Sequence, residues 1–336
     1  MEPHDIASEG SESWGPVLDD LPRRRAASRS MGGDQRLAKH RGAGKLDARA
    51  RIAELVDDGS FLELGTLVGG AQAPADAVVT GSARIDGRPV MVAAEDFTVL
   101  AGTISSAANA KRYRAAEVAL RDRVPLVMLL EGAGYRPDGG SHTRSPTDLI
   151  AQARCSGRVP IVSAVLGASA GHGALIAPMS DFAVMSQQGA IFTAGPPVVL
   201  ESLGERIAKE DLGGPGMALP SGLIHNAGTD DASTLELVRS YLSYFPSSAW
   251  SYPPDAAAGG DDGPRDIPEM LDLVPRNSRR VYDMRAVIDH VFDAGSAFEV
   301  QPDYGRSLIT SLCRLGGHPV AVVANQPLVL SGSVDA

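Results

Sequence analysis

Hydrophobic and polar positions follow a helical pattern first and a strand pattern afterwards. Between residues 37 and 56, leucine, isoleucine and valine recur at helical spacing, and the pattern stops at Asp58, Gly59 and Ser60. Two short apolar runs follow at residues 78–85 and 89–94, joined by a turn at Asp86–Gly87, a dipeptide typical of hairpins. This part of the sequence predicts a helix followed by a β-hairpin.

Further along, helical segments alternate with continuous apolar runs. Such runs are typical of parallel strands covered on both faces, and they occupy residues 124–130, 159–166 and 182–186. Helices are predicted at residues 105–121 and 147–156. In the first of these helices we expect the alanines to face inward and three cations to face outward: Lys111, Arg112 and Arg114. The alternation predicts an α/β fold in which helices cover a mainly parallel sheet.

An internal repeat links the two ends of the sequence. RARIAELVDDGSFLEL at residues 49–64 reappears as RAVIDHVFDAGSAFEV at 285–300, and ARIDGRPVMV at 83–92 reappears as CRLGGHPVAV at 313–322. A helix–turn–strand–hairpin unit therefore occurs twice. The first copy continues for much longer than the second, so we expect a tandem-domain protein with a complete first domain and the beginning of a second.

Local composition marks the segments outside these domains. Residues 1–31 are rich in Ser, Glu, Gly and Arg without hydrophobic periodicity, which predicts a disordered leader. A stretch rich in Pro, Gly and Asp predicts a linker at residues 253–280. The expected domains are residues 32–252 and the incomplete second copy at 281–336.

Overall composition excludes several classes of protein. The chain has 336 residues, 43% of them hydrophobic, which is enough for one large domain or two smaller ones. No apolar run reaches the roughly 18 residues of a membrane span, and the acidic first residues do not read as a secretory signal. Two cysteines cannot form a disulfide framework. A net charge of −10 argues against nucleic-acid binding, so we expect a cytoplasmic protein with no membrane or nucleic-acid partner.

Candidate chemistry lies in two glycine-containing clusters, each directly after a predicted buried strand. The first cluster is EGAGYR at residues 131–136, and the second is GASAGHG at residues 167–173, where we expect a helix to begin. Small residues let a ligand approach the backbone, and two converging N–H groups form an oxyanion hole that stabilises the enolate of a thioester. The alternative is that the small residues only permit close packing of helix and strand.

The second cluster also matches G-x-S-x-G, the motif around the nucleophile of α/β-hydrolases. In that hypothesis Ser169 is the nucleophile, and Asp181 and His225 complete a triad. His172 and Glu131 are candidate general bases, with backbone packing and a salt bridge as the respective alternatives. Metal-ligand and P-loop patterns are absent from the sequence, so no metal site is predicted.

Nine ordered motifs resemble a known family. They are SFLEL (60–64), IDGRPV (85–90), EDFTV (95–99), AGHGA (170–174), PMSDF (178–182), TAGPPVV (193–199), EDLGG (210–214), SGLIH (221–225) and ANQP (324–327). The resemblance as a whole extends over about residues 36–334. The set resembles the carboxyltransferase (β) subunit of biotin-dependent acyl-CoA carboxylases, of the propionyl-CoA and methylcrotonoyl-CoA type.

The resemblance implies a fold, a reaction and partners. The fold is the ClpP/crotonase-like ββα superhelix, with two such domains per chain. The reaction is transfer of CO2 from carboxybiotin, held on a separate carrier protein, to the α-carbon of an acyl-CoA. In this family acyl-CoA lies mainly against the N-terminal domain, and biotin enters against the C-terminal domain of a facing subunit in a hexameric ring. The implied partner is a biotin carboxylase or biotin carboxyl carrier subunit.

The resemblance also assigns residues. The family motif D-S-G-G-A-R matches residues 131–136, so the amides of Ala133 and Gly134 would hold the thioester oxygen. The implied substrate-binding residues are Gly132, Ala170, Gly171, His172, Gly173 and Gly195. Lys111 and Arg112 would either meet the phosphates of CoA or form a solvated helix face.

Departures from the family pattern keep alternatives open. Ala133 stands where the family has glycine, which would cost about 1 kcal/mol if that position requires positive φ. Ser169 and His172 stand where the family has cysteine and glycine. The alternatives are a biotin-dependent acyl-CoA decarboxylase subunit, a catalytically weak assembly subunit, and a serine hydrolase that uses Ser169.

Overall fold

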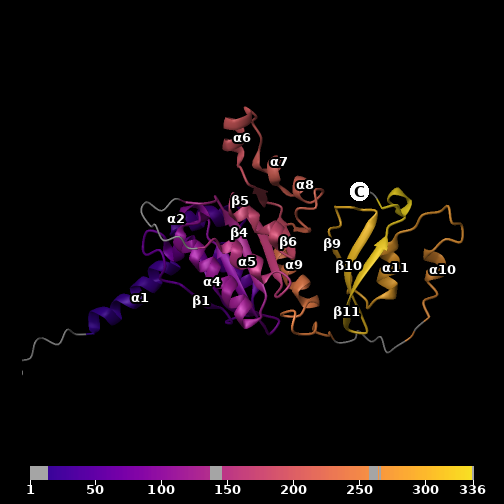
Figure 1. Ribbon diagram of the computed structural model, residues 1–336, viewed down its shortest axis with the longest axis horizontal. Coiled ribbons are helices and arrows are strands. Elements are labelled where there is room, and N and C mark those ends of the chain that lie inside the picture. The colour runs from indigo at the N-terminus through magenta and orange to yellow at the C-terminus, as the bar shows by residue number, and fades with distance from the viewer. Residues whose placement is uncertain (1–13, 137–145, 257–263, 265, 335–336) are drawn as a thin grey trace, which may run out of the picture.

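The computed structural model describes residues 14–136, 146–256, 264 and 266–334. They form an eight-stranded sheet and a three-stranded sheet, with helices packed on both (Figure 1). Within the described residues, no helix is both long and apolar enough to cross a membrane. Residues 1–13 of the expected leader and residues 257–263 and 265 of the expected linker lie outside the described residues.

The larger sheet has the strand order β1-β2-β3-β4-β5-β6-β8, with β7 paired to β5. The first three strands are antiparallel, and the strands from β3 onward are parallel. The bounds are β1 (Leu62–Leu64), β2 (Val78–Ile85), β3 (Arg88–Glu95), β4 (Leu126–Gly132), β5 (Ile161–Ala170), β6 (Phe182–Ser186), β7 (Ala190–Phe192) and β8 (Asn226–Gly228). The predicted hairpin and the three predicted parallel strands are confirmed.

Helices cover the two faces of this sheet and create two hydrophobic clusters. Alternate residues of β4 point to opposite faces, so Leu126, Met128 and Leu130 pack in one cluster with α4 and α5, and Val127 and Leu129 pack in the other with α3 and α9. The helix bounds in this part of the chain are α1 (Gly15–Arg29), α2 (Asp34–Gly42), α3 (Ala48–Leu55), α4 (Ser106–Asp122), α5 (Asp148–Cys155), α6 (Pro196–Leu203), α7 (Lys209–Gly213), α8 (Pro215–Ala218) and α9 (Asp231–Tyr244).

Short turns complete the first region. These are η1 (Pro74–Ala77), η2 (Leu100–Gly102), η3 (Gly173–Leu175) and η4 (Ala177–Met179). The segment that holds α6 and α7 projects from the sheet as an arm (Figure 1).

The three-stranded sheet repeats the beginning of the larger one. It consists of β9 (Phe298–Val300), β10 (Leu308–Leu315) and β11 (His318–Asn325) in the order β11-β10-β9, with α10 (Met270–Leu273), α11 (Met284–Val291) and turn η5 (Leu330–Gly332) beside it. Equivalent ion pairs confirm the predicted repeat. Arg49 pairs with Glu63 at 2.8 Å in the first copy, and Arg285 pairs with Glu299 at 2.6 Å in the second.

The N-terminal segment differs from the prediction. Residues Gly15–Arg29 form helix α1, where the sequence predicts a disordered leader. The helix has almost no apolar face, and Trp14 at its start is 74% exposed, so hydrophobic periodicity did not reveal it. Local contacts such as the i,i+4 ion pair of Arg24 with Asp20 accompany it.

Candidate functional site

The clusters at residues 131–136 and 167–173 lie against each other. Gly134 and Gly171 have positive φ angles of 89° and 58°. A Cβ atom built on Gly134 would lie 3.3 Å from the carbonyl oxygen of Ala170, and one built on Gly171 would lie 3.8 Å from Cα of Gly134. A side chain at either position would enter the space between the two backbones, so both positions favour glycine. The structure thus brings together the two segments that the sequence singled out.

Several main-chain amides at this junction are free to bind a ligand. Among the described residues, the N–H groups of Gly134, His172 and Gly173 have no hydrogen-bond acceptor. The N–H of Gly171 is occupied, because it donates to the carbonyl oxygen of Phe192 at 3.0 Å. Free amides from both clusters therefore lie where the two backbones touch.

Ala133 does not have the role that the sequence predicts. Its N–H donates to the carbonyl oxygen of Ala101 in turn η2 at 2.9 Å and is not free for a ligand. Its φ is not positive, so the expected strain does not arise. The assignment of paired oxyanion amides to Ala133 and Gly134 is wrong for Ala133, and Gly134 remains.

The other small residues have different positions. β5 continues through Ala170 and short 3₁₀ turns follow it, so the helix expected after the second cluster is absent. Gly132 lies inside β4, where a Cβ would be 2.5 Å from the carbonyl oxygen of Gly102, and it permits close backbone packing. Gly195 is the N-cap residue of α6, and a Cβ there would lie 3.3 Å from the ring of Phe192.

Lys111 and Arg112 point inward, which corrects the predicted outward orientation. Lys111 is 7% exposed and donates to the carbonyl oxygen of Ala75 at 2.7 Å, and burial lowers its pKa to about 8. Arg112 is fully buried between the carboxylates of Glu95 and Asp148. Neither cation is accessible to the phosphates of a ligand.

Arg112 belongs to a buried polar chain beneath the junction. Its Nε donates to Oδ2 of Asp148 at 2.7 Å, and its Nη1 donates to Glu95. The other carboxylate oxygen of Asp148 lies 2.5 Å from Nε2 of His172. Burial alone would raise the pKa of Asp148, but the charges and hydrogen bonds of Arg112 and His172 bring it down to about 2. The imidazole of His172 is thus tied to a buried carboxylate.

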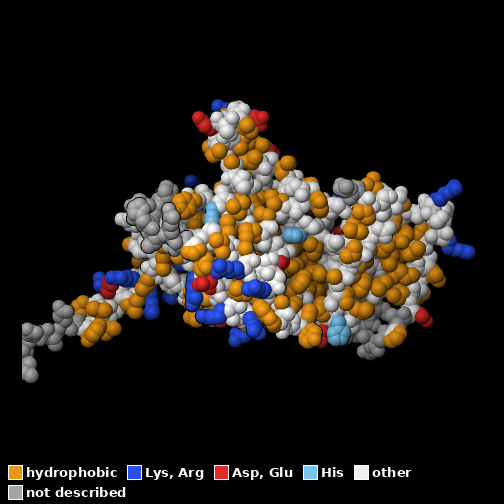
Figure 2. Space-filling model, viewed as in Figure 1, with side chains coloured by type: hydrophobic (Ala, Val, Ile, Leu, Met, Phe, Trp, Pro, Cys, Tyr) orange, Lys and Arg blue, Asp and Glu red, His pale blue; other side chains and the backbone are white. Residues whose placement is uncertain are grey.

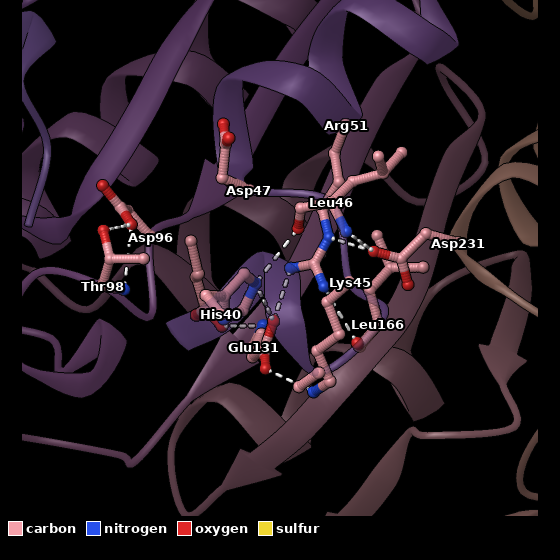
Figure 3. Close-up of polar contacts among 12 residues, drawn as sticks. His40, Lys45, Leu46, Asp47, Arg51, Asp96, Thr98, Glu131, Leu166 and Asp231 are labelled. Carbon is pink, nitrogen blue, oxygen red and sulfur yellow. Dashed lines mark hydrogen bonds and ion pairs between the residues drawn. The ribbon is translucent and has the colours of Figure 1, made fainter. Parts of the chain in front are cut away.

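Glu131, at the end of β4, is an ion-paired carboxylate. Its oxygens lie 2.6 Å from Nζ of Lys45, 2.6 Å from Nη1 of Arg51 and 3.7 Å from Nε2 of His40 (Figure 3). Arg51 also pairs with Asp231 at 2.8 Å. Burial raises the pKa of Glu131, but the cationic charges of Arg51 and Lys45 outweigh that effect and lower it. The structure therefore favours the salt-bridge alternative over a general base.

A cavity of about 700 Å³ opens beside Glu131. Cations dominate its charged lining, which makes the cavity suited to an anionic ligand. The lining residues are Arg36, Lys39, His40, Ala43, Lys45, Phe97, Thr98, Leu100, Ala101, Glu131, Gln188 and Lys209. Sequence analysis missed this site, although the run RLAKHRGAGK at residues 36–45 is strongly basic.

The geometry contradicts the hydrolase hypothesis. Oγ of Ser169 is buried and has no hydrogen-bond partner among the described residues, whereas a serine nucleophile needs a base within reach. Nδ1 of His225 accepts a hydrogen bond from the N–H of Ala183 at 2.9 Å, and a carboxylate oxygen of Asp181 accepts one from the N–H of Ile161 at 2.8 Å. The proposed triad members are therefore engaged elsewhere.

The chain has a mixed α/β fold with a largely parallel sheet, and the solved structures that resemble it are crotonase-fold carboxyltransferases. The model of the carboxyl transferase domain family matches residues 39–336. The chain belongs to this family.

Individual relatives agree with the family assignment. The chain is 35% identical to the propionyl-CoA carboxylase beta chain of Roseobacter denitrificans, over 95% of this chain and 65% of the relative. It is 34% identical to the methylmalonyl-CoA decarboxylase subunit alpha of Veillonella parvula, again over 95% of this chain and 65% of the relative. The chain thus spans a little under two thirds of the length of these relatives.

A solved structure supports the fold over nearly the whole chain. The hexameric transcarboxylase 12S, with hydrolysed methylmalonyl-coenzyme A bound, superposes with a TM-score of 0.88 at 30% identity, covering 97% of this chain and 66% of that one.

Proposed function

We propose that this chain binds an acyl-CoA and forms the enolate-stabilising part of a carboxyltransferase, which transfers CO2 from carboxybiotin to the α-carbon of the acyl group. The observation that carries this proposal is the pairing of free amides from two strand ends beside a cationic cavity. Family membership supports it, since the relatives include acyl-CoA carboxylase and carboxyltransferase subunits.

The amides act on the thioester oxygen. As the α-proton leaves, negative charge moves onto that oxygen, and the N–H of Gly134 together with an N–H from His172 or Gly173 donates to it. One such donor is worth about 10²–10³ in rate. Glu95, Glu131 and Asp148 are all bound to cations, so we assign no carboxylate of this chain as the base. Carboxybiotin, on a separate carrier protein, would supply the carboxyl group, and we assign none of the described residues to it.

The cationic cavity replaces Lys111 and Arg112 as the proposed CoA site. Lys39, Lys209 and Ala101 all line the cavity. The carbonyl oxygen of Ala101 accepts a hydrogen bond from the N–H of Ala133, the residue before Gly134. A CoA molecule with its phosphates among the lysines and its thioester at the junction would connect the two features. The solvated lysines at the cavity mouth would attract the phosphates of CoA over about 10 Å at moderate salt.

A decarboxylase subunit is the second candidate. The relative from Veillonella parvula carries that activity in its name, and the same amides would stabilise the same enolate when the carboxyl group leaves. The two candidates differ only in the direction of transfer. An assay that starts once from acyl-CoA and once from the carboxylated acyl-CoA separates them.

The proposed assembly follows from the relatives. We propose a homo-oligomer, hexameric as named for transcarboxylase 12S, that works with a biotin carboxylase or biotin carboxyl carrier subunit in the cytoplasm. The carboxyltransferase domain at residues 32–252 and the second copy at residues 281–336 remain our proposed boundaries.

Gly134→Val tests the role of the junction. We expect kcat/KM for acyl-CoA carboxylation, measured on the full-length protein with its biotin partner across a panel of acyl-CoAs, to fall at least about 100-fold. The matched control is Gly157→Val, because Gly157 also has positive φ (68°) but its Cβ would meet no atom within 4 Å. Unchanged kinetics in folded Gly134→Val would overturn the assignment of the amides.

Lys39→Glu tests the cavity. Reversing one charge at its mouth should raise KM for acyl-CoA about tenfold, leave kcat nearly unchanged, and matter less at high salt. The control is Arg114→Glu on the exposed face of α4, where the side chain is 59% exposed and is not among the residues that line the cavity. Equal effects of the two reversals would show that the cavity does not bind the phosphates.

A further inference from the structure

His172 stands between two glycines in the turn that offers free amides, and the proposed reaction does not use its imidazole. Nε2 lies 2.5 Å from Oδ1 of Asp148, and the side chain of Asp148 is fully buried. Gly171 and Gly173 have no side chain that could hold the turn in place. The contact with Asp148 is therefore the side-chain anchor of this turn.

Asp148 is itself held firmly. Its second carboxylate oxygen accepts from Nε of Arg112 at 2.7 Å and from Nε2 of Gln152 at 3.0 Å, and its backbone N–H donates to Oδ1 of Asn109 at 3.0 Å. These contacts fix the carboxylate in one orientation. His172 is consequently tied to a rigid point on α5.

The chain of contacts continues to the other half of the junction. Arg112 also donates to Oε1 of Glu95, and Oε2 of Glu95 accepts from the N–H of Glu131 at 2.8 Å. Glu131 precedes Gly134 by only a few residues at the end of β4. A Cβ built on Gly173 would lie 3.4 Å from Oε1 of Glu95, so the carboxylate of Glu95 lies close to the turn itself.

The buried carboxylates around Arg112 explain why a hydrogen-bond donor is needed at position 172. Two buried carboxylates, Glu95 and Asp148, surround the single guanidinium of Arg112. An N–H donated by Nε2 of His172 gives Oδ1 of Asp148 its hydrogen-bond partner. Removing the donor would leave a buried carboxylate oxygen without a partner, which is expensive in a low-dielectric interior.

We propose that His172 is a positioning residue, which acts through Asp148, Arg112 and Glu95 to fix the separation between the free amides of His172 and Gly173 and the amide of Gly134. The proposal rests on the proposed function only in so far as these amides bind the thioester oxygen. A misplacement of about 1 Å in such a site costs on the order of 100-fold in rate.

The kinetic test compares His172→Ala with His172→Gln in the full-length protein with its biotin partner. We expect His172→Ala to lower kcat by about 10- to 100-fold with KM for acyl-CoA nearly unchanged. Glutamine places an N–H donor at a similar reach, so His172→Gln should restore most of kcat. The matched control is His318→Ala, which breaks another histidine–aspartate contact, 2.7 Å from Asp255, at the surface. A loss in KM alone, or no rescue by glutamine, would overturn the proposal.

Hydrogen–deuterium exchange tests the positioning without any assay of activity. In His172→Ala, peptides that cover residues 168–174 and 130–135 should both exchange faster, and the hairpin formed by β10 and β11 at residues 308–325 should not. Faster exchange at 168–174 alone would refute the connection to β4. If His172→Ala does not fold, the same comparison between wild type and Asp148→Asn decides the question. If the wild type carboxylates no acyl-CoA, the proposed function fails, but the exchange result still decides the positioning role.

Discussion

The two copies of the repeat share their local polar contacts but differ in what surrounds them. In the first copy, the carboxylate of Asp57 accepts hydrogen bonds from both amides of the hairpin turn, at 2.9 and 2.7 Å. In the second copy, Asp293 does the same at 2.8 and 2.7 Å. The turns after the hairpins, η2 and η5, also share three consecutive residues with positive φ, the last of which is glycine.

Burial separates the copies. In the first, β4 pairs in parallel with β3, so residues 90–95 are all buried. In the second, β11 is the outer strand of its sheet among the described residues, and Val323 is 69% exposed. Hydrophobic side chains accordingly cover much of the visible surface of this unit (Figure 2). The same local sequence pattern makes a hairpin in both places, but only a neighbouring strand turns it into part of a core.

The turns show the same difference. The carbonyl oxygen of Ala101 in η2 accepts a hydrogen bond from Ala133 at the end of β4, and the site forms beside that contact. No such contact is made at Ser331 in η5 among the described residues. The candidate site therefore needs the end of β4 beside turn η2, and the repeated turn alone does not form it.

The largest expected contrast between the copies comes from the equivalent glycines of the two turns. A Cβ on Gly102 would lie 2.3 Å from the carbonyl oxygen of Glu131, whereas one on Gly332 would first meet the flexible side chain of Asn325 at 2.8 Å. Gly102→Ala should lower the free energy of unfolding by about 3 kcal/mol or more, because backbone must move. Gly332→Ala should cost about 1 kcal/mol, mainly from its positive φ. Urea denaturation measures both, and equal losses would contradict the proposed difference in packing.

For the aspartates Asp57 and Asp293 we expect a smaller difference in stability between the copies, and here the second copy loses more. Asp293 is 8% exposed and Asp57 is more exposed. Asp57→Ala should lower the free energy of unfolding by about 1 kcal/mol and Asp293→Ala by about 2 kcal/mol, because charge-assisted hydrogen bonds count for more when buried. Asp58→Ala, at a neighbouring exposed position, should change stability by less than about 0.5 kcal/mol. A larger loss for Asp57→Ala than for Asp293→Ala would show that burial does not set the strength of this contact.

Hydrophobic pattern predicted most of the fold and part of the site. The hairpin, the three parallel strands, α4, α5 and the repeat all follow from it. The error at Arg112 is instructive, because Ala108, Arg112, Ala115 and Ala119 share one helical face. Because Arg112 is charged, we predicted that it faces outward, although its spacing from these alanines places it on the buried face. Arg112 is buried because Glu95 and Asp148, from distant segments, provide partners.

The sequence by itself determined the first hairpin, three parallel strands with two of their helices, the two glycine-containing clusters and the family, since each depends on residues that are neighbours along the chain. Only the tertiary structure decided that Gly134 keeps a free amide and Ala133 does not, and that Lys39 and Lys209 share a cavity. The free amide and the shared cavity depend on contacts between segments that are far apart in the sequence. Whether an N–H is free or a charge is paired is decided by the partner that the fold brings to it.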